Sequence, residues 1–255
     1  MKKLKLFALT AVALMGVTTV ANAATAMLAQ DDFVGISFWI ISMGMLASTA
    51  FFFMERSTVN KEWQTSLTVA CLVCLVAFWH YLYMRVDYMA DGNSPTELRY
   101  VDWLITVPLQ IVEFYLIVAA CVSVSLSLFW KLLVGSLVML IGGYLGEADH
   151  IDVTVGFIIG MVGWVYVIWL IWAGDAAQAK EAAGNENLSM AFDGIKYIVT
   201  VGWLIYPIGY FMTYIMGSDV GMLNSIYNLA DLVNKFLFGL VIWHAAMRDS
   251  GVAKG

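Results

Sequence analysis

A lysine and an aspartate lie one helical turn apart inside the last apolar segment of the chain. Lys235 follows Asp231 by four residues within GMLNSIYNLADLVNKFLFGLVIW, so the two side chains share a face of a helix. A lysine in hydrocarbon costs about 2.5–3.5 kcal/mol, and lysine is also the residue that forms Schiff bases with carbonyl compounds. The amine is therefore expected to be either ion-paired or covalently modified.

A second polar group lies in the segment RYVDWLITVPLQIVEFYLIVAA. Its members are separated by three, four and seven residues: Arg99, Asp102, Thr106 and Glu113. This spacing places them on one stripe of a helix, with Asp102 and Glu113 about 16 Å apart along its axis. Hydrogen bonding between helices would explain Thr106, but it explains the two carboxyl groups poorly. Because ionisable groups inside a membrane are functional hypotheses by default, the pattern favours a proton relay.

Three large rings could shape a pocket for a ligand near Lys235. Trp203 and Tyr206 share a helix face just before Pro207, and Trp103 adds a ring from the third apolar segment. Aromatic stripes are usually packing, but rings at this depth would suit a flat, apolar, conjugated ligand. Pro207 removes a backbone hydrogen bond and is expected to weaken its helix locally.

Two further polar side chains lie in apolar segments. His80, in the sequence FWHY, is either a hydrogen-bonded core residue or a neighbour that sets the proton affinity of a carboxylate. Gln110 follows Thr106 by four residues, so it either faces the ligand or bonds a neighbouring helix. His150 and His244 are too far from His80 in the sequence to indicate a metal site.

The elements that must position these residues are membrane-spanning helices. Of the 255 residues, 62% are hydrophobic and only 13% are charged, against about 25% charged in a soluble domain. Each span needs about 20 apolar residues. The qualifying segments are Phe33–Met54, Ser66–Met84, Tyr100–Val122, Leu126–Leu145, Val153–Ala173, Ile195–Met216 and Met222–His244. We therefore predict an all-α membrane protein, a bundle of seven transmembrane helices whose longest connection is Gly174–Gly194.

Residues 1–23 have the pattern of a cleavable signal peptide. Three lysines precede an apolar stretch, Leu6–Val20, and Ala21-Asn22-Ala23 fits a small-x-small cleavage site. A retained helix is the alternative. Cleavage would leave a transmembrane domain of residues 24–255 in a bacterial inner membrane, with its N-terminus outside the cytoplasm.

The distribution of lysine and arginine predicts the same orientation. The connections after helices one, three and five, with the C-terminal segment, carry Arg56, Lys61, Lys131, Lys180, Lys196, Arg248 and Lys254. The opposite side carries Arg85 and the acidic loop 147–152. The C-terminus is therefore expected to be cytoplasmic. The net charge of −6 is dispersed along the chain, so it indicates no nucleic-acid partner.

Taken together, these residues resemble the microbial rhodopsins from about Phe33 to the end of the chain. The R-x-x-D-x-x-x-T pattern followed by Glu113 matches the proton-pumping branch of that family. The D-x-x-x-K pattern of the seventh segment matches its retinal-attachment site, and W-x-x-Y-P matches its retinal pocket. His80, and a glutamate at position 113, are typical of the proteorhodopsin group within the family.

The resemblance implies all-trans retinal bound to Lys235 as a protonated Schiff base. Asp102 would be the primary counterion and proton acceptor, and Asp231 the second counterion. Glu113 would be the cytoplasmic proton donor, held protonated by its apolar surroundings until it is needed.

The resemblance also assigns roles to the remaining residues. Arg99 and Thr106 would belong to the proton path, and His80 would pair with Asp102 and modulate its pKa. Trp103, Trp203, Tyr206 and Pro207 would line the retinal. Gln110 would tune the pigment towards blue absorption. The family further implies a homo-oligomer, a pentamer or a hexamer.

These implications favour one function over two alternatives. The first hypothesis is a light-driven outward proton pump rather than an enzyme. A slow-cycling photosensory rhodopsin is the alternative, but sensors generally lack a carboxylate donor such as Glu113. In the third hypothesis, a retinal-free receptor or transporter, Asp231–Lys235 is only an ion pair. The paired outer glutamates of bacteriorhodopsin have no evident equivalent, since the segment 217–220 holds one carboxylate, so early proton release is not expected.

Overall fold

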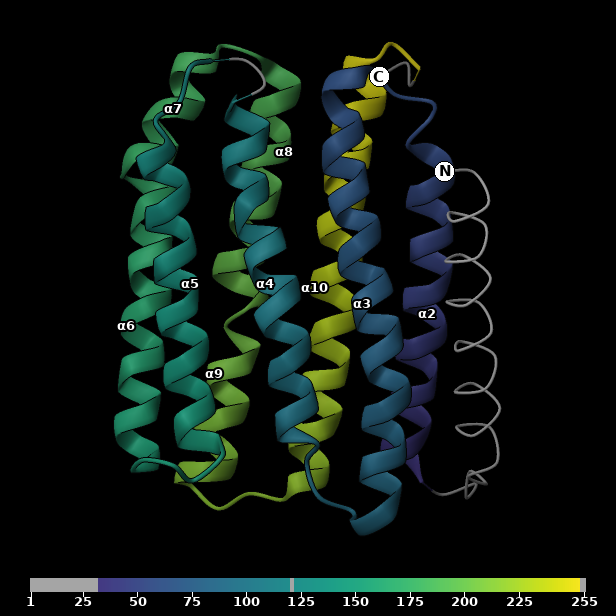
Figure 1. Cartoon of the computed structure of the whole chain (residues 1–255), viewed down its shortest axis with the longest axis vertical. Coiled ribbons are helices and arrows are strands. Elements are labelled where there is room, and N and C mark those ends of the chain that lie inside the picture. The colour runs from purple at the N-terminus through teal and green to yellow at the C-terminus, as the bar shows by residue number, and fades with distance from the viewer. Residues whose placement is uncertain (1–31, 120–121, 253–255) are drawn as a thin grey trace, which may run out of the picture.

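The computed structural model describes residues 32–119 and 122–252, and in these ranges the chain is a bundle of long helices without strands (Figure 1). The elements are α2 (Phe33–Glu55), α3 (Lys61–Asp91), α4 (Thr96–Ala119), α5 (Leu126–Glu147), α6 (Val153–Trp172), α7 (Asp175–Ala183), α8 (Glu186–Tyr197), η1 (Ile198–Gly202), α9 (Ile205–Tyr210), η2 (Phe211–Ile215) and α10 (Val220–Asp249). Within the described residues, seven helical segments are long and apolar enough to cross a membrane. The predicted seven-helix, all-α class is confirmed. The predicted signal peptide lies outside the described residues.

The prediction that Gly174–Gly194 is a long connection was wrong. Helices α7 and α8 occupy nearly all of it, and only Gly184 and Asn185 separate them. Alanine, glutamate, glutamine and lysine, which dominate α7, are strong helix formers. Gly184 ends α7 at a φ of +62°, which suits a glycine. The Asn185 side chain then caps α8 by accepting from the Leu188 N–H at 3.0 Å. Hydropathy marks where the apolar surface ends, and these helices continue beyond it.

The helices pack in chain order, and α10 closes the bundle. Each of α2 to α6 contacts the next, while α10 contacts α2, α3, α8 and α9. Helices α5 and α6 approach closely because glycines face each other between them: a Cβ at Gly163 would lie 2.5 Å from the backbone nitrogen of Met139. Because α10 packs against so many elements, its inward side chains can meet residues from most of the bundle.

The bundle has two ends that differ in their connections. The upper end in Figure 1 carries connections 56–60 and 184–185 and the end of α10, whereas the lower end carries connections 92–95, 148–152 and 216–219. We refer to these as the upper and lower ends below.

The sixth spanning segment is irregular on both sides of Pro207. The π-helical turns η1 and η2 flank α9, and the Trp203 N–H bonds the carbonyl of Ile198, five residues back, at 3.0 Å. The Asn234 side chain of α10 donates to the Gly202 carbonyl at 3.0 Å. Proline lacks a backbone N–H, and π-turns are frequent at functional sites. The irregular segment lies against α10 beside Lys235.

The acidic loop expected at 147–152 begins one residue later than predicted. Glu147 is the last residue of α5 and is buried, whereas Asp149 and His150 are exposed. The Glu147 side chain faces the bundle, because Glu147 lies on the inward face of the last turn of α5. The Glu147 carboxyl group is therefore inside the protein.

Candidate functional site

Lys235 lies between two buried carboxylates in the middle of the bundle. Its side chain is 3% exposed, and its Nζ donates to Asp102 of α4 and to Asp231 of α10, the latter at 3.1 Å. Neither carboxylate is accessible to solvent. The Asp231 contact follows from the helical spacing. The Asp102 contact joins residues 133 positions apart, and only the packing of α4 against α10 could create it.

Asp231 accepts hydrogen bonds from three different helices besides the one from Lys235. The hydroxyls of Tyr206 and Tyr81 donate at 2.6 and 2.9 Å, and the indole Nε1 of Trp103 donates at 3.2 Å. Hydrogen bonds to a charged acceptor are stronger than neutral ones. These donors fix the Asp231 carboxylate in position and leave it little capacity for further partners.

Asp102 is held by fewer donors. One of its oxygens accepts from Lys235, and in the described part of the chain the other has no hydrogen-bond partner. His80 lies beside that second oxygen, with its Nδ1 3.8 Å away, which is too long for a hydrogen bond. The same Nδ1 is 3.0 Å from the carbonyl of Val76 on its own helix. Asp102 therefore keeps an oxygen available for a proton.

Arg99 is a fully buried cation held by neutral groups. Its guanidinium donates to the Asn224 and Asn228 side-chain oxygens at 3.0 and 3.2 Å. It also lies 5.7 Å from the ring centroid of Phe38 and 5.3 Å from that of Tyr227. In the part of the chain that the structure describes, it forms no ion pair within 4.0 Å, so its charge acts on the carboxylates around it without being neutralised by direct contact.

Thr106 and Glu113 continue the α4 stripe towards the upper end. Thr106 is buried and its hydroxyl donates to the backbone carbonyl of Asp102 at 3.0 Å, so it does not bridge to another side chain. Glu113 is fully buried beside Ser66 of α3. The Ser66 side chain interacts with its carboxyl group, but among the described residues neither carboxyl oxygen has a hydrogen bond of ordinary geometry. A buried carboxyl group with so little hydrogen bonding is costly in its charged form, and such a group suits proton storage.

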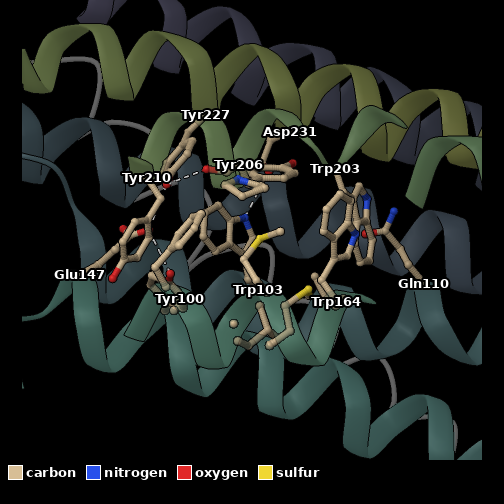
Figure 2. A pocket seen from close by; sticks show the side chains of 18 of the residues that line it. Tyr100, Trp103, Gln110, Glu147, Trp164, Trp203, Tyr206, Tyr210, Tyr227 and Asp231 are labelled. Atoms are coloured by element: carbon tan, nitrogen blue, oxygen red, sulfur yellow. Dashed lines mark hydrogen bonds between the residues drawn. The ribbon is translucent and has the colours of Figure 1, made fainter. Parts of the chain in front are cut away.

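A cavity extends from Lys235 between α4, α5, α6, α9 and α10. Figure 2 shows the Trp203 and Trp164 rings beside Gln110 at one end, and four polar side chains gathered at the other. The residues predicted to line a pocket all do so: Trp103, Gln110, Trp203, Tyr206 and Pro207. The cavity is mostly apolar and aromatic, and the lysine amine reaches into it. A long, conjugated ligand with a carbonyl at the lysine end fits these residues.

Several residues of the site were missed in the sequence. The residues that bond the site or line the cavity without having been predicted include Tyr81, Tyr100, Glu147, Trp164, Asn224, Tyr227 and Asn228. A signal existed for the asparagines, because Asn224, Asn228, Asp231 and Lys235 are spaced by four, three and four residues and so form one polar stripe. No comparable signal marked Tyr81, since its partner lies on another helix.

Comparison with known proteins finds relatives of similar length. Residues 32–248 match the family model of bacteriorhodopsin-like proteins. The chain is 53% identical to the blue-light absorbing proteorhodopsin of Gamma-proteobacterium Hot 75m4 over 88% of this chain and 90% of that one. It is 52% identical to the green-light absorbing proteorhodopsin of Gamma-proteobacterium EBAC31A08, with the same coverage. The crystal structure of blue light-absorbing proteorhodopsin from Med12 superimposes with a TM-score of 0.76 at 56% identity, covering 85% of this chain and 99% of that one.

Proposed function

The chain belongs to the bacteriorhodopsin-like family, and on that premise we propose that it is a light-driven outward proton pump with all-trans retinal bound to Lys235 as a protonated Schiff base. The observation that carries this proposal is the position of Lys235, between two buried carboxylates and at the wall of an aromatic cavity. A lysine kept only as an ion pair would have no need of that cavity. Bound retinal would supply absorption of light and an isomerisation that reorients the N–H at the Lys235 nitrogen.

The two carboxylates have different tasks in this proposal. Asp102 takes the proton that leaves the Lys235 nitrogen, because one of its oxygens has no other hydrogen bond in the described structure. Asp231 stays ionised as the second counterion, because three donors from other helices already stabilise its charge. His80 lies close enough to Asp102 to modulate its pKa.

Glu113 returns a proton to the Lys235 nitrogen from the opposite side. It lies eleven residues beyond Asp102 on α4, about 16 Å along the helix axis towards the upper end. Lys131, Lys180 and Lys196 belong to elements at that end, which makes it the cytoplasmic end by the positive-inside rule. A donor on the cytoplasmic side and an acceptor towards the lower end together give outward transport.

Gln110 is proposed to set a blue absorption. It lines the cavity beside Trp203 (Figure 2), where a polar amide stabilises the ground-state charge near the Lys235 nitrogen and so widens the excitation gap. Overall identity does not decide the colour, because the chain is about equally similar to blue- and green-absorbing relatives. Trp103, Trp203, Tyr206 and Pro207 enclose the ligand.

The same proposal includes the cellular context. The protein spans the bacterial inner membrane with its C-terminus in the cytoplasm, residues 1–23 are removed as a signal peptide, and the subunits form pentamers or hexamers. N-terminal sequencing of the membrane-inserted protein tests the removal of residues 1–23, and native mass spectrometry of the purified pigment tests the number of subunits.

The decisive experiment is light-driven acidification by cells that express the chain. Cells supplied with all-trans retinal are illuminated while the external pH is followed, with and without a protonophore. Acidification that the protonophore abolishes supports the pump. A coloured protein that moves no protons would instead be a photosensor, and a chain that stays colourless with retinal would overturn the proposal. Lys235→Ala is the control, since it must remove both colour and acidification.

A further inference from the structure

Glu147 is a buried carboxyl group that the proposed proton path does not use. Glu147 is 9% exposed and lies with three tyrosines at one end of the cavity (Figure 2). It is the last residue of α5, which ends at the lower end of the bundle. One oxygen accepts from the Tyr100 hydroxyl at 3.0 Å and from the Tyr227 hydroxyl at 2.9 Å. The Tyr214 side chain also interacts with this carboxyl group, but among the described residues the second oxygen has no hydrogen bond of ordinary geometry. Burying a carboxyl group with one oxygen so weakly bonded is costly, so its presence calls for an explanation.

The two tyrosines connect Glu147 to the helices that carry the counterions. Tyr100 precedes Asp102 by two residues on α4, and Tyr227 precedes Asp231 by four residues on α10. Four residues correspond to about 6 Å along a helix axis. Glu147 therefore lies about one helical turn beyond the carboxylate pair, on the side away from Glu113.

Arg99 lies between Asp231 and Glu147. Its guanidinium is 3.5 Å from the Tyr81 hydroxyl, which bonds Asp231, and 5.3 Å from the ring centroid of Tyr227, which bonds Glu147. Its charge acts on both Asp231 and Glu147. The other titratable groups facing Glu147 are tyrosines from four elements, namely Tyr100, Tyr210, Tyr214 and Tyr227. Arg99 is therefore a cation shared by Asp231 and Glu147.

The route from Glu147 to water is short. It is the last residue of α5, and the connection that follows contains the exposed side chains of Asp149 and His150. We propose that Glu147 is the proton-release group of the pump. After Asp102 has received a proton from the Lys235 nitrogen, that proton passes through the polar groups around Arg99 to the Glu147 carboxylate. The resulting acid then loses the proton to water at the lower end, which restores the carboxylate.

This inference rests on the proposed function, and it supplies the outer group that the segment 217–220 lacks. A structural role is the alternative, since Glu147 also ties α5 to α4 and α10. The two explanations differ in one respect: a clamp needs only an acceptor oxygen, whereas a release group must bind and lose a proton.

Glu147→Gln separates these explanations, because glutamine keeps an acceptor for the tyrosines but cannot ionise. In flash experiments on the retinal-loaded protein, we expect proton appearance in the medium, reported by a pH-sensitive dye, to slow at least tenfold. The dark absorption maximum and the rate at which the Lys235 nitrogen loses its proton should stay unchanged. Asp149→Asn is the matched control: it removes an exposed carboxylate two residues away, at a φ of 59° that asparagine tolerates, and it should release protons like the wild type.

Release at the wild-type rate in Glu147→Gln would make Glu147 a structural clamp and overturn the inference, while the pump itself would stand. A wild-type protein that acidifies nothing would instead refute the proposed function. If Glu147→Gln forms no pigment, Glu147→Asp replaces it in the test, because aspartate retains a carboxyl group. Infrared difference spectra of the wild type should then contain a carboxyl band that follows the time course of release and shifts in Glu147→Asp. Identical bands in the two proteins would equally reject the assignment.

Discussion

Asp102 and Asp231 hold the same Lys235 amine but differ in the number of other donors that they accept. Asp231 has three further donors on α3, α4 and α9, whereas one oxygen of Asp102 accepts none in the described structure. Two residues of the same type, bonded to one amine, are thereby made chemically unequal. The difference comes from where Tyr81, Trp103 and Tyr206 point, and it separates a permanent counterion from a proton acceptor.

Replacing the acceptor should stop transport while leaving the pigment. Asp102→Asn keeps the size of the side chain and cannot take a proton from the Lys235 nitrogen, so light-driven acidification should fall at least tenfold. The measurement is external pH in illuminated cells, normalised to the amount of pigment. Undiminished acidification would show that Asp102 is not the acceptor.

Removing one donor from Asp231 should destabilise the pigment. Tyr206→Phe deletes the 2.6 Å hydrogen bond and leaves the buried carboxylate with one donor fewer, which costs about 1–3 kcal/mol. The temperature at which the pigment bleaches should therefore fall. Tyr83→Phe is the control, because Tyr83 is 43% exposed and its loss should leave the bleaching temperature unchanged. Equal bleaching temperatures for both variants would contradict the importance of this bond.

Removing the proposed donor should slow only the second half of the cycle. Glu113→Gln has no proton to give, so the Lys235 nitrogen should regain its proton at least tenfold more slowly, while the colour in the dark is unchanged. Time-resolved visible absorption measures this step, and a small membrane-permeant weak acid should restore the rate. Glu97→Gln, exposed in the first turn of the same helix, should behave like the wild type. An unaltered return in Glu113→Gln would exclude it as the donor.

Replacing the cavity amide should change the colour. Gln110→Leu removes the polar group beside the conjugated ligand, so the absorption maximum should move to longer wavelength. Gln110→Asn keeps an amide and should shift it less. Absorption spectra of the purified pigments decide the matter, and a maximum that stays in place in Gln110→Leu would assign the tuning to other residues.

The sequence by itself determined the class of fold and the core of the site. Spacing within one helix is set by its covalent geometry, so Asp231 and Lys235, and the stripe from Arg99 to Glu113, could be placed on common faces without a structure. The long apolar stretches likewise indicated seven spans, because hydrocarbon leaves a spanning segment few alternatives to the helix.

Only the tertiary structure decided which faces meet. The pairing of Lys235 with Asp102, the donors around Asp231 and the asparagines around Arg99 all depend on how the helices are rotated and packed, which no local spacing records. Hydropathy also failed at the helix ends, where it assigned Glu147 to a loop and 174–194 to a connection. Polarity shows where apolar surface stops, but hydrogen bonding and packing determine where a helix stops and which polar end is buried.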